Sequence, residues 1–149
     1  MTKKFEDYFS ELQTDMVAIS LEYVDSQADM IYIYCSYEPG AYYFNVFYKI
    51  DNSILHKHEL NLKDKNIYDI SIDRQKTLLK IGRKNLKQIH EICKQFNRDM
   101  PTEMKLQYNV RNNSLKGKYK YELVYSNHET LLPNDIFNEW AEEIKKEIK

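Results

Sequence analysis

Two histidines, His56 and His58, are the most obvious candidates for metal chemistry in this sequence. In an extended strand both imidazoles would project from the same side, a spacing that can hold zinc or copper when a third ligand comes from elsewhere. No cysteine or further histidine lies close to them in the sequence to complete such a site. We therefore interpret them as partly exposed strand residues and expect neither a metal nor another cofactor.

Acidic side chains gather in the predicted turns and strand ends of the first half of the chain. Paired carboxylates can catalyse hydrolysis, but the spacing here defines no pair and no motif accompanies it. As a group, an acidic rim beside two tyrosines can instead imitate a phosphate backbone and occupy the basic cleft of a nuclease. The residues that we expect to contact such a partner are Asp25, Asp29, Glu38, Tyr42, Tyr43 and Asp51.

The predicted helix over residues 73–97 has a basic face that would suit nucleic acid. Between Arg74 and Arg98 the sequence holds eight Lys/Arg residues and one acid, Glu91. The simpler interpretation is the solvated outer face of a helix, since the overall pI near 6.4 is well below that of a typical nucleic-acid-binding domain. A nucleic-acid-binding module that uses this face remains the alternative function.

The sequence has none of the familiar catalytic fingerprints. It contains no GxGxxG, P-loop, HExxH, GxSxG or CxxC motif. Cys35 and Cys93 lie far apart in apolar patterns, which favours two reduced buried thiols over a disulfide. We therefore expect a binding protein and not an enzyme.

The composition predicts one folded domain over residues 1–149. Hydrophobic residues make up 42% and charged residues 30%, and three glycines and three prolines leave little room for linkers. The N-terminal segment mixes charges into its apolar positions, unlike a signal peptide, and no apolar run is long enough to span a bilayer. We expect a cytoplasmic protein with no membrane partner.

Hydrophobic periodicity predicts the elements of the first half. Apolar residues at helical spacing predict a helix over residues 3–15, and the alternation from Val17 to Tyr23 then predicts a strand. Three further strands are predicted over residues 30–37, 41–50 and 54–60. Short connections between four strands predict an antiparallel meander, because parallel crossovers need a dozen or more residues.

The second half begins with the long helix over residues 73–97, in which Gly82 on the apolar face indicates close contact with the sheet. Strands over 102–110 and 119–125 form a predicted hairpin around a turn at 111–117, and Pro133 opens a last helix. The predicted apolar stripe of that helix consists of Ile136, Phe137, Trp140, Ile144 and Ile148. The predicted fold class is α+β, with an antiparallel sheet of about six strands. The order is helix, four strands, helix, two strands, helix.

Three segments of the last third resemble a known family: "MPTEMKLQYNV", "GKYKYELVYSN" and "LPNDIFNEWAEEIKKEIK". Their distinctive features are Pro101 before a strand, the alternating Tyr119 and Tyr121, and the helix start from Pro133 to Trp140. Together with the order of elements, which agrees over nearly the full chain, they make the chain similar to the YezG-like immunity proteins of bacterial polymorphic toxin systems.

The resemblance implies an intracellular antitoxin that binds the toxic domain of a secreted effector, often a nuclease, and blocks it until export. Such an inhibitor needs a rigid surface that buries roughly 1,200–2,000 Å² with complementary charge, and no reaction chemistry. Two features depart from the family pattern: no tryptophan lies near Pro101, and the second half of the chain is basic. We therefore expect a cytoplasmic immunity protein whose partner is a cognate toxin domain, with the toxin's class and the oligomeric state left open.

Overall fold

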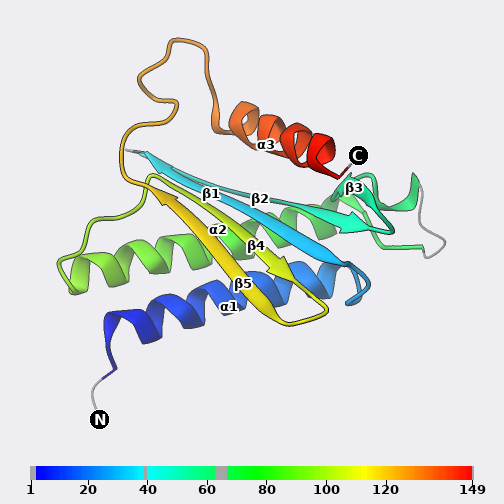
Figure 1. Ribbon diagram of the computed structural model, residues 1–149. Coiled ribbons are helices and arrows are strands. Elements are labelled where there is room, and N and C mark those ends of the chain that lie inside the picture. The colour runs from blue at the N-terminus through cyan, green and yellow to red at the C-terminus, as the bar shows by residue number, and fades with distance from the viewer. Residues whose placement is uncertain (1–2, 39, 63–66, 149) are drawn as a thin grey trace.

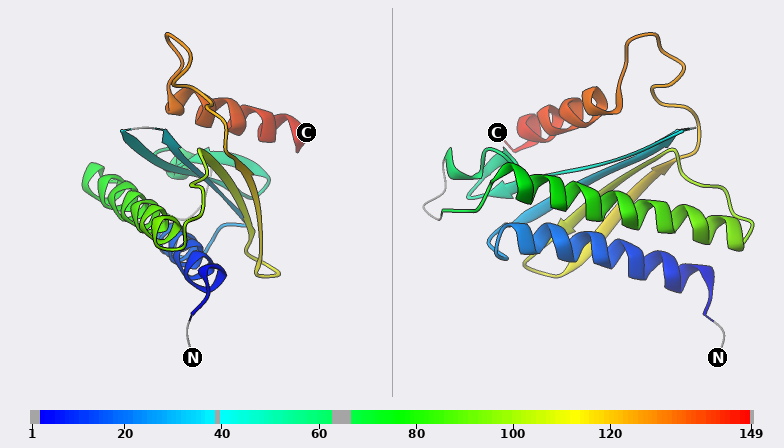
Figure 2. Two further views of the ribbon diagram at one scale, coloured as in Figure 1. Left: turned by 90° about the vertical axis from the view of Figure 1, so that its left-hand side faces the viewer. Right: turned by 180° about the vertical axis from the view of Figure 1, so that it is seen from behind.

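The computed structural model describes residues 3–38, 40–62 and 67–148 and places them in three layers (Figure 1). The middle layer is one antiparallel sheet in the order β3-β2-β1-β4-β5. Helices α1 and α2 lie side by side on one face and α3 lies on the other, as the view from the side also shows (Figure 2). The elements are α1 (Phe5–Tyr23), β1 (Met30–Glu38), β2 (Ala41–Ile50), β3 (Ser53–His56), the 3-10 helix η1 (Leu60–Leu62), α2 (Ile72–Gln95), β4 (Glu103–Asn109), β5 (Ser114–Lys120) and α3 (Pro133–Glu147). The predicted α+β class is confirmed.

The predicted strand from Val17 to Tyr23 is wrong, because these residues continue helix α1. Gln13 and Ser20 interrupt the apolar stripe of this helix, although both are buried. Each has a hydrogen-bond partner: the Ser20 hydroxyl donates to the carbonyl of Met16 at 2.8 Å, and the Gln13 amide donates to a tyrosine hydroxyl of β5 at 2.8 Å. These polar residues interrupt the helical pattern of apolar residues. The alternation from Val17 to Tyr23 is therefore the stronger signal in the sequence, although the residues are helical.

The sheet has five strands instead of about six, and the meander has three strands, β1 to β3. Asp51 and Asn52 both have positive φ and form the two-residue turn between β2 and β3. β3 ends at His56, so the strand that was predicted to reach residue 60 is shorter. β1 also pairs antiparallel with β4, which joins the meander and the second hairpin in one sheet.

The second strand of that hairpin begins earlier than predicted. β5 runs over Ser114–Lys120, so the predicted turn at 111–117 contains half of a strand. All seven residues of β5 are exposed. Alternating with its lysines, the strand carries Leu115, Gly117 and Tyr119, so the glycine interrupts the apolar alternation that marks a half-buried strand. Tyr121 and Leu123, which continue the alternation, lie beyond its end.

The inner face of the sheet packs on α1 and α2, and Gly82 is a point of close approach. A Cβ atom at Gly82 would lie 2.1 Å from Cδ1 of Phe44 on β2. Phe44 is only 1% exposed, so its ring has little room to move away. The predicted contact of Gly82 with the sheet is confirmed.

Replacing Gly82 with alanine should lower the free energy of unfolding by about 1–3 kcal/mol, because overpacking of the Phe44 ring outweighs the gain in helix propensity of about 1 kcal/mol. Chemical denaturation of the two proteins measures the difference. Gln88→Ala, at an exposed position of the same helix, serves as the matched control and should change stability little. A Gly82→Ala protein as stable as the parent would show that the helix and sheet have room to separate.

Helix α3 covers part of the outer face of the sheet. Its apolar residues Phe137, Trp140, Ala141 and Ile144 form a second buried cluster with Tyr32, Tyr34, Phe47 and Ile54. The rings of Trp140 and Phe47 meet edge to face, with centroids 5.1 Å apart. The predicted apolar stripe of the last helix is therefore the one that packs on the sheet.

Cys35 and Cys93 are buried and unpaired, as predicted. Burial raises the pKa of both thiols. In residues 3–38, 40–62 and 67–148, none of the helices combines the length and the apolar character that crossing a lipid bilayer requires.

Candidate functional site

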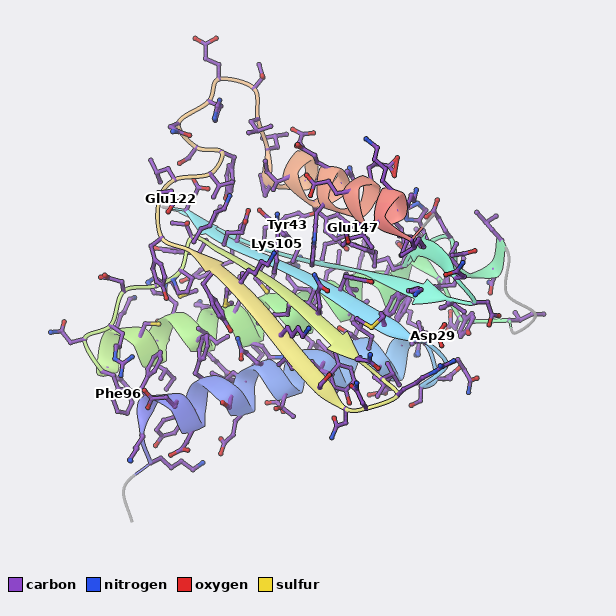
Figure 3. All side chains as sticks on the ribbon, viewed as in Figure 1. Asp29, Tyr43, Phe96, Lys105, Glu122 and Glu147 are labelled. Atoms are coloured by element: carbon purple, nitrogen blue, oxygen red, sulfur yellow. The ribbon has the colours of Figure 1, made fainter. Side chains whose placement is uncertain are left out.

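Aromatic side chains from three elements meet where α1 begins and α2 ends. We name this surface the aromatic corner, and its members are Phe5, Tyr8, Phe9, Phe96, Tyr119 and Tyr121. Phe96 stands at the end of α2 beside the start of α1 (Figure 3). Its ring centroid lies 5.9 Å from that of Phe5 and 5.9 Å from that of Tyr8. Phe9 continues the group, with its centroid 5.8 Å from that of Tyr119 on β5.

Unlike the core aromatics, several members of the aromatic corner face solvent. Tyr121 is 58% exposed, Tyr119 39% and Phe96 37%. Partial burial still raises the pKa of Tyr121, and the electrostatic effect of the neighbouring Cys93 and Tyr119 adds to it, so the hydroxyl stays protonated at neutral pH. The corner therefore presents apolar rings with polar hydroxyl tips.

Two cations lie over the rings of this corner. The guanidinium of Arg98 is 4.6 Å from the centroid of Phe5, and the same group forms an ion pair with Glu6 at 3.1 Å. The ammonium of Lys3 lies 5.2 Å from the ring centroid of Tyr8. The cations are thus placed by aromatic and acidic neighbours, which limits the freedom they would lose on binding a partner.

Exposed aromatic rings combined with arginine have the composition of protein-binding surfaces. Tyr, Trp, Phe and Arg are enriched at such interfaces, and a few of them usually carry most of the binding free energy. The Gln13 amide donates to the Tyr119 hydroxyl, which ties α1 to β5 below the exposed rings. The aromatic corner can therefore act as a rigid binding surface.

Helical and strand periodicity places these aromatic residues in separate stripes and does not group them. Phe5, Tyr8 and Phe9 lie on one α1 face, but a one-dimensional pattern does not show that α1 begins where α2 and β5 end. The available signal was an excess of large rings at three element ends. This signal can be interpreted only when the topology shows that the three element ends meet.

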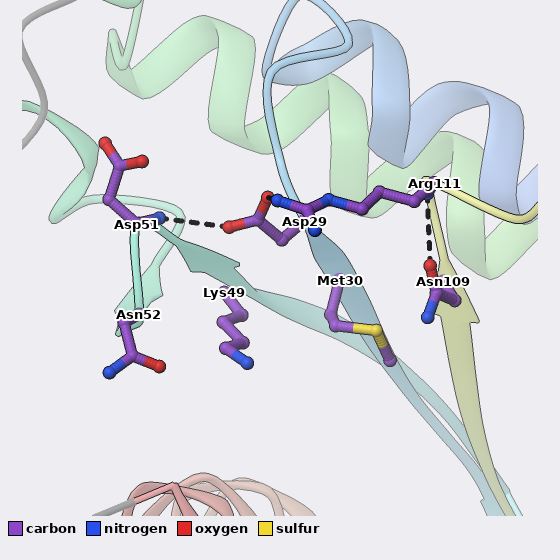
Figure 4. Close-up of a pocket in the computed structure, with 7 residues that line it drawn as sticks. All are labelled: Asp29, Met30, Lys49, Asp51, Asn52, Asn109 and Arg111. Atoms are coloured by element: carbon purple, nitrogen blue, oxygen red, sulfur yellow. Dashed lines mark hydrogen bonds and ion pairs between the residues drawn. The ribbon is translucent and has the colours of Figure 1, made fainter.

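The structure brings together two of the six residues predicted to contact a partner, Asp29 and Asp51. Asp29 directly precedes β1 and Asp51 directly follows β2, whereas Asp25 lies in the turn after α1. Asp29 and Asp51 line a surface depression of about 390 Å³ (Figure 4). The Asp29 carboxylate accepts a hydrogen bond from the Asp51 backbone N–H at 3.1 Å.

Two cations share this depression, so it is not an acidic rim. Lys49 on β2 lines it, and Arg111 in the turn between β4 and β5 extends to within 4.0 Å of Asp29. Arg111 arrives because β4 pairs with β1, an adjacency that was not predicted. The depression carries opposite charges side by side, which does not imitate a phosphate backbone.

Glu38, the fourth predicted residue, is 1% exposed and lies at the opposite end of β1. Its carboxylate accepts hydrogen bonds from the backbone N–H groups of Val124, Tyr125 and Ser126, and from the Ser126 hydroxyl. Burial alone would raise the pKa of Glu38, but these hydrogen bonds outweigh it and hold the pKa below its ordinary value. Glu38 thus holds the segment between β5 and α3 and presents no surface to a partner.

Tyr42 and Tyr43 are neighbours on β2 and therefore point to opposite faces of the sheet. The Tyr42 hydroxyl and Nδ1 of His90 on α2 form a hydrogen bond of 2.6 Å. The Tyr43 hydroxyl donates to Asn134 at the start of α3 at 2.8 Å. The two tyrosines cannot stand side by side in one rim, and Figure 3 shows Tyr43 well apart from Asp29.

The basic face of α2 is exposed, as the sequence predicts. Its exposed cations include Lys76, Lys80, Arg83, Lys84 and Lys87. Within the described part of the chain, none of these five lies within ion-pair distance of a carboxylate, whereas Lys94 pairs with Glu91 at 3.6 Å. This face is therefore an uncompensated positive stripe.

His56 and His58 lie close together, with ring centroids 5.8 Å apart. His56 packs against Phe137 of α3, and burial lowers the pKa of its imidazole. The residues that the structure describes contain no group of three or more His, Cys, Asp or Glu side chains placed to hold a metal ion. His56 therefore contributes to packing under α3, whereas His58 is exposed.

Comparison with known proteins adds no assignment. No protein-family model matches the chain, and no curated protein is significantly similar to it in sequence.

Proposed function

We propose that this chain is an immunity protein that binds a cytotoxic effector domain and blocks it, as the resemblance to YezG-like proteins implies. The three segments that carry the resemblance correspond to β4, to β5 with the residues after it, and to α3. The aromatic corner is the observation that carries the proposal, because it offers exposed rings and placed cations on a rigid support. Inhibition by binding needs such a surface and no reaction chemistry.

Tyr121 is the residue of the corner at which we expect the largest loss of binding. It is the most exposed of the corner's large side chains, so its truncation leaves the core intact. Tyr121→Ala should weaken a complex with the toxin domain by at least about 2 kcal/mol, which is about thirtyfold in Kd. Calorimetric titration with the purified toxin domain measures this loss.

Leu132→Ala is the matched control, because Leu132 is 61% exposed and lies outside the aromatic corner, before α3. It should leave the affinity unchanged. Equal affinities for the parent and the Tyr121→Ala protein would remove the corner from the interface. Failure of the parent itself to bind any toxin domain that is encoded beside it would remove the proposed function.

Nucleic-acid binding through α2 is the second candidate, because the positive stripe is exposed and uncompensated. Contacts with phosphates make the affinity fall steeply as salt rises. Binding of this chain to oligonucleotides, with a salt dependence that disappears in a Lys80→Glu/Lys87→Glu protein, would favour this function over immunity.

A further inference from the structure

Strand β5 ends the sheet, and its outer side has no strand beside it among the described residues. The ladder between β1 and β4 shows which backbone groups of β5 are free. The Tyr37 N–H donates to the carbonyl of Thr102 at 2.9 Å, and the Val110 N–H donates to that of Asp29 at 3.0 Å. The even-numbered residues of β4 therefore face β1, and its odd-numbered residues face β5.

The same alternation continues into β5. Lys105 of β4 is paired with Lys118, so Lys118 and the residues two positions away direct their backbone groups toward β4. Leu115, Gly117 and Tyr119 must then direct their N–H and C=O groups outward, into solvent. These groups form a row of donors and acceptors that is ready to pair with another extended chain.

The outer face of this edge is strongly basic. Lys105 is paired with both Tyr34 and Lys118, and paired residues project from the same face. Tyr34 packs on Phe137 and Trp140, so this is the face on which α3 lies. The lysines that share it are Lys105, Lys116, Lys118 and Lys120.

One carboxylate offsets these four cations. Glu103 lies 3.8 Å from the ammonium of Lys105 and 3.9 Å from that of Lys120. Lys116 and Lys118 have no ion-pair partner among the described residues. A positive charge therefore runs along the free edge.

The charge decides which strand the edge can accept. A second copy paired antiparallel through β5, centred on Gly117, would place Lys116 opposite Lys118 of its partner, and like charges directly opposite destabilise a sheet. Acidic side chains at alternate positions of an added strand would instead face the lysines. The side chains between them would lie on the inner side, beside Leu115 and Tyr119, which are 38% and 39% exposed.

We propose that β5 binds an extended segment of a protein partner as a sixth strand, and that this segment alternates acidic with apolar residues. The edge runs directly into the aromatic corner through Tyr119, so one partner can occupy both. The identity of that partner as a toxin domain rests on the proposed function. The preference for an acidic, alternating strand does not.

The test uses a capped peptide of seven residues, the length of β5, in which glutamate alternates with valine. Added to the isotope-labelled chain, it should slow hydrogen exchange of the Leu115, Gly117 and Tyr119 amides. The same peptide with lysine in place of glutamate should bind at least about tenfold more weakly, given the strength of three cross-strand charge pairs.

Two variants separate backbone pairing from charge attraction. Lys116→Glu/Lys118→Glu/Lys120→Glu should reverse the preference between the two peptides, whereas Lys76→Glu/Lys80→Glu/Lys87→Glu on α2, with the same change in net charge, should not. Leu115→Pro removes one outward N–H at an edge position that tolerates proline. It should weaken the acidic peptide more than Leu115→Ala does.

Several results would overturn the proposal. These are binding without protection of the three amides, equal effects of the two triple variants, or a chain that dimerises through β5. A toxin complex that forms but is indifferent to the β5 variants would also overturn it while leaving the immunity function standing. Conversely, binding of the acidic peptide to β5 would support the proposal even if the chain binds no toxin domain.

Discussion

Replacing Trp140 with alanine is expected to lower the free energy of unfolding by about 3–5 kcal/mol. Trp140 is 4% exposed, and its ring meets the rings of Tyr32 and Phe47 edge to face, with centroids 5.8 Å and 5.1 Å away. Truncation would leave a cavity between α3 and the central strands. Denaturant unfolding followed by circular dichroism measures the loss.

The position of the loss within the molecule is as informative as its size. Because Tyr32 and Phe47 lie on the central strands β1 and β2, we expect faster hydrogen exchange there as well as in α3. Glu139→Ala, at the exposed preceding position, is the control and should have little effect. Faster exchange confined to α3 would mean that this helix docks without supporting the sheet.

Glu38→Gln is expected to lower the free energy of unfolding by about 1.5–3 kcal/mol, because a neutral amide replaces a carboxylate that accepts several hydrogen bonds. The Gln NH₂ group would also face backbone N–H donors of residues 124–126, which it cannot accept. The comparison of denaturation midpoints with those of Glu129→Gln, an exposed position on the same segment, isolates the effect.

The same carboxylate predicts a pH dependence. Its folded pKa lies below the ordinary value of 4.5, so its stabilising contribution is fully present above that value. The contribution is lost as the pH falls from there through the folded pKa. The Glu38→Gln protein should therefore lose less stability than the parent over this acidic range. Parallel pH profiles for the two proteins would show that Glu38 is not held as an anion.

Much of the fold can be predicted from hydrophobic periodicity, because long amphipathic elements have a clear repeat of apolar residues in the sequence. The helix predicted over 73–97 is α2, and the strands predicted over 30–37 and 41–50 are β1 and β2 within one residue. The buried side chains of these three elements are mostly apolar. The stripe of α3 was also predicted, and the same residues pack under it.

The errors arise where buried residues are polar or where strand residues are exposed. Gln13 and Ser20 are polar but buried in α1, so the second half of this helix has the sequence pattern of a strand. β5 is exposed on both faces, so its Lys116, Gly117 and Lys118 carry no strand signal. An edge strand is defined by its backbone partner, and single-sequence patterns report side chains.

The predicted contact residues separated for a similar reason. Their acidic character was visible in the sequence, but Glu38 accepts hydrogen bonds within the protein and Asp29 is paired with Arg111, which comes from the turn between β4 and β5. The aromatic corner and the β5 edge depend on which element ends meet. Neither surface can be recognised from the order of the residues alone.

Titration of the purified chain into an activity assay of the toxin domain encoded beside it tests the proposed immunity function most directly. The account predicts that toxin activity falls linearly to zero at one equivalent of chain, and that Tyr121→Ala shifts this curve while Leu132→Ala does not. Full toxin activity in the presence of a large excess of the parent chain would contradict the immunity function.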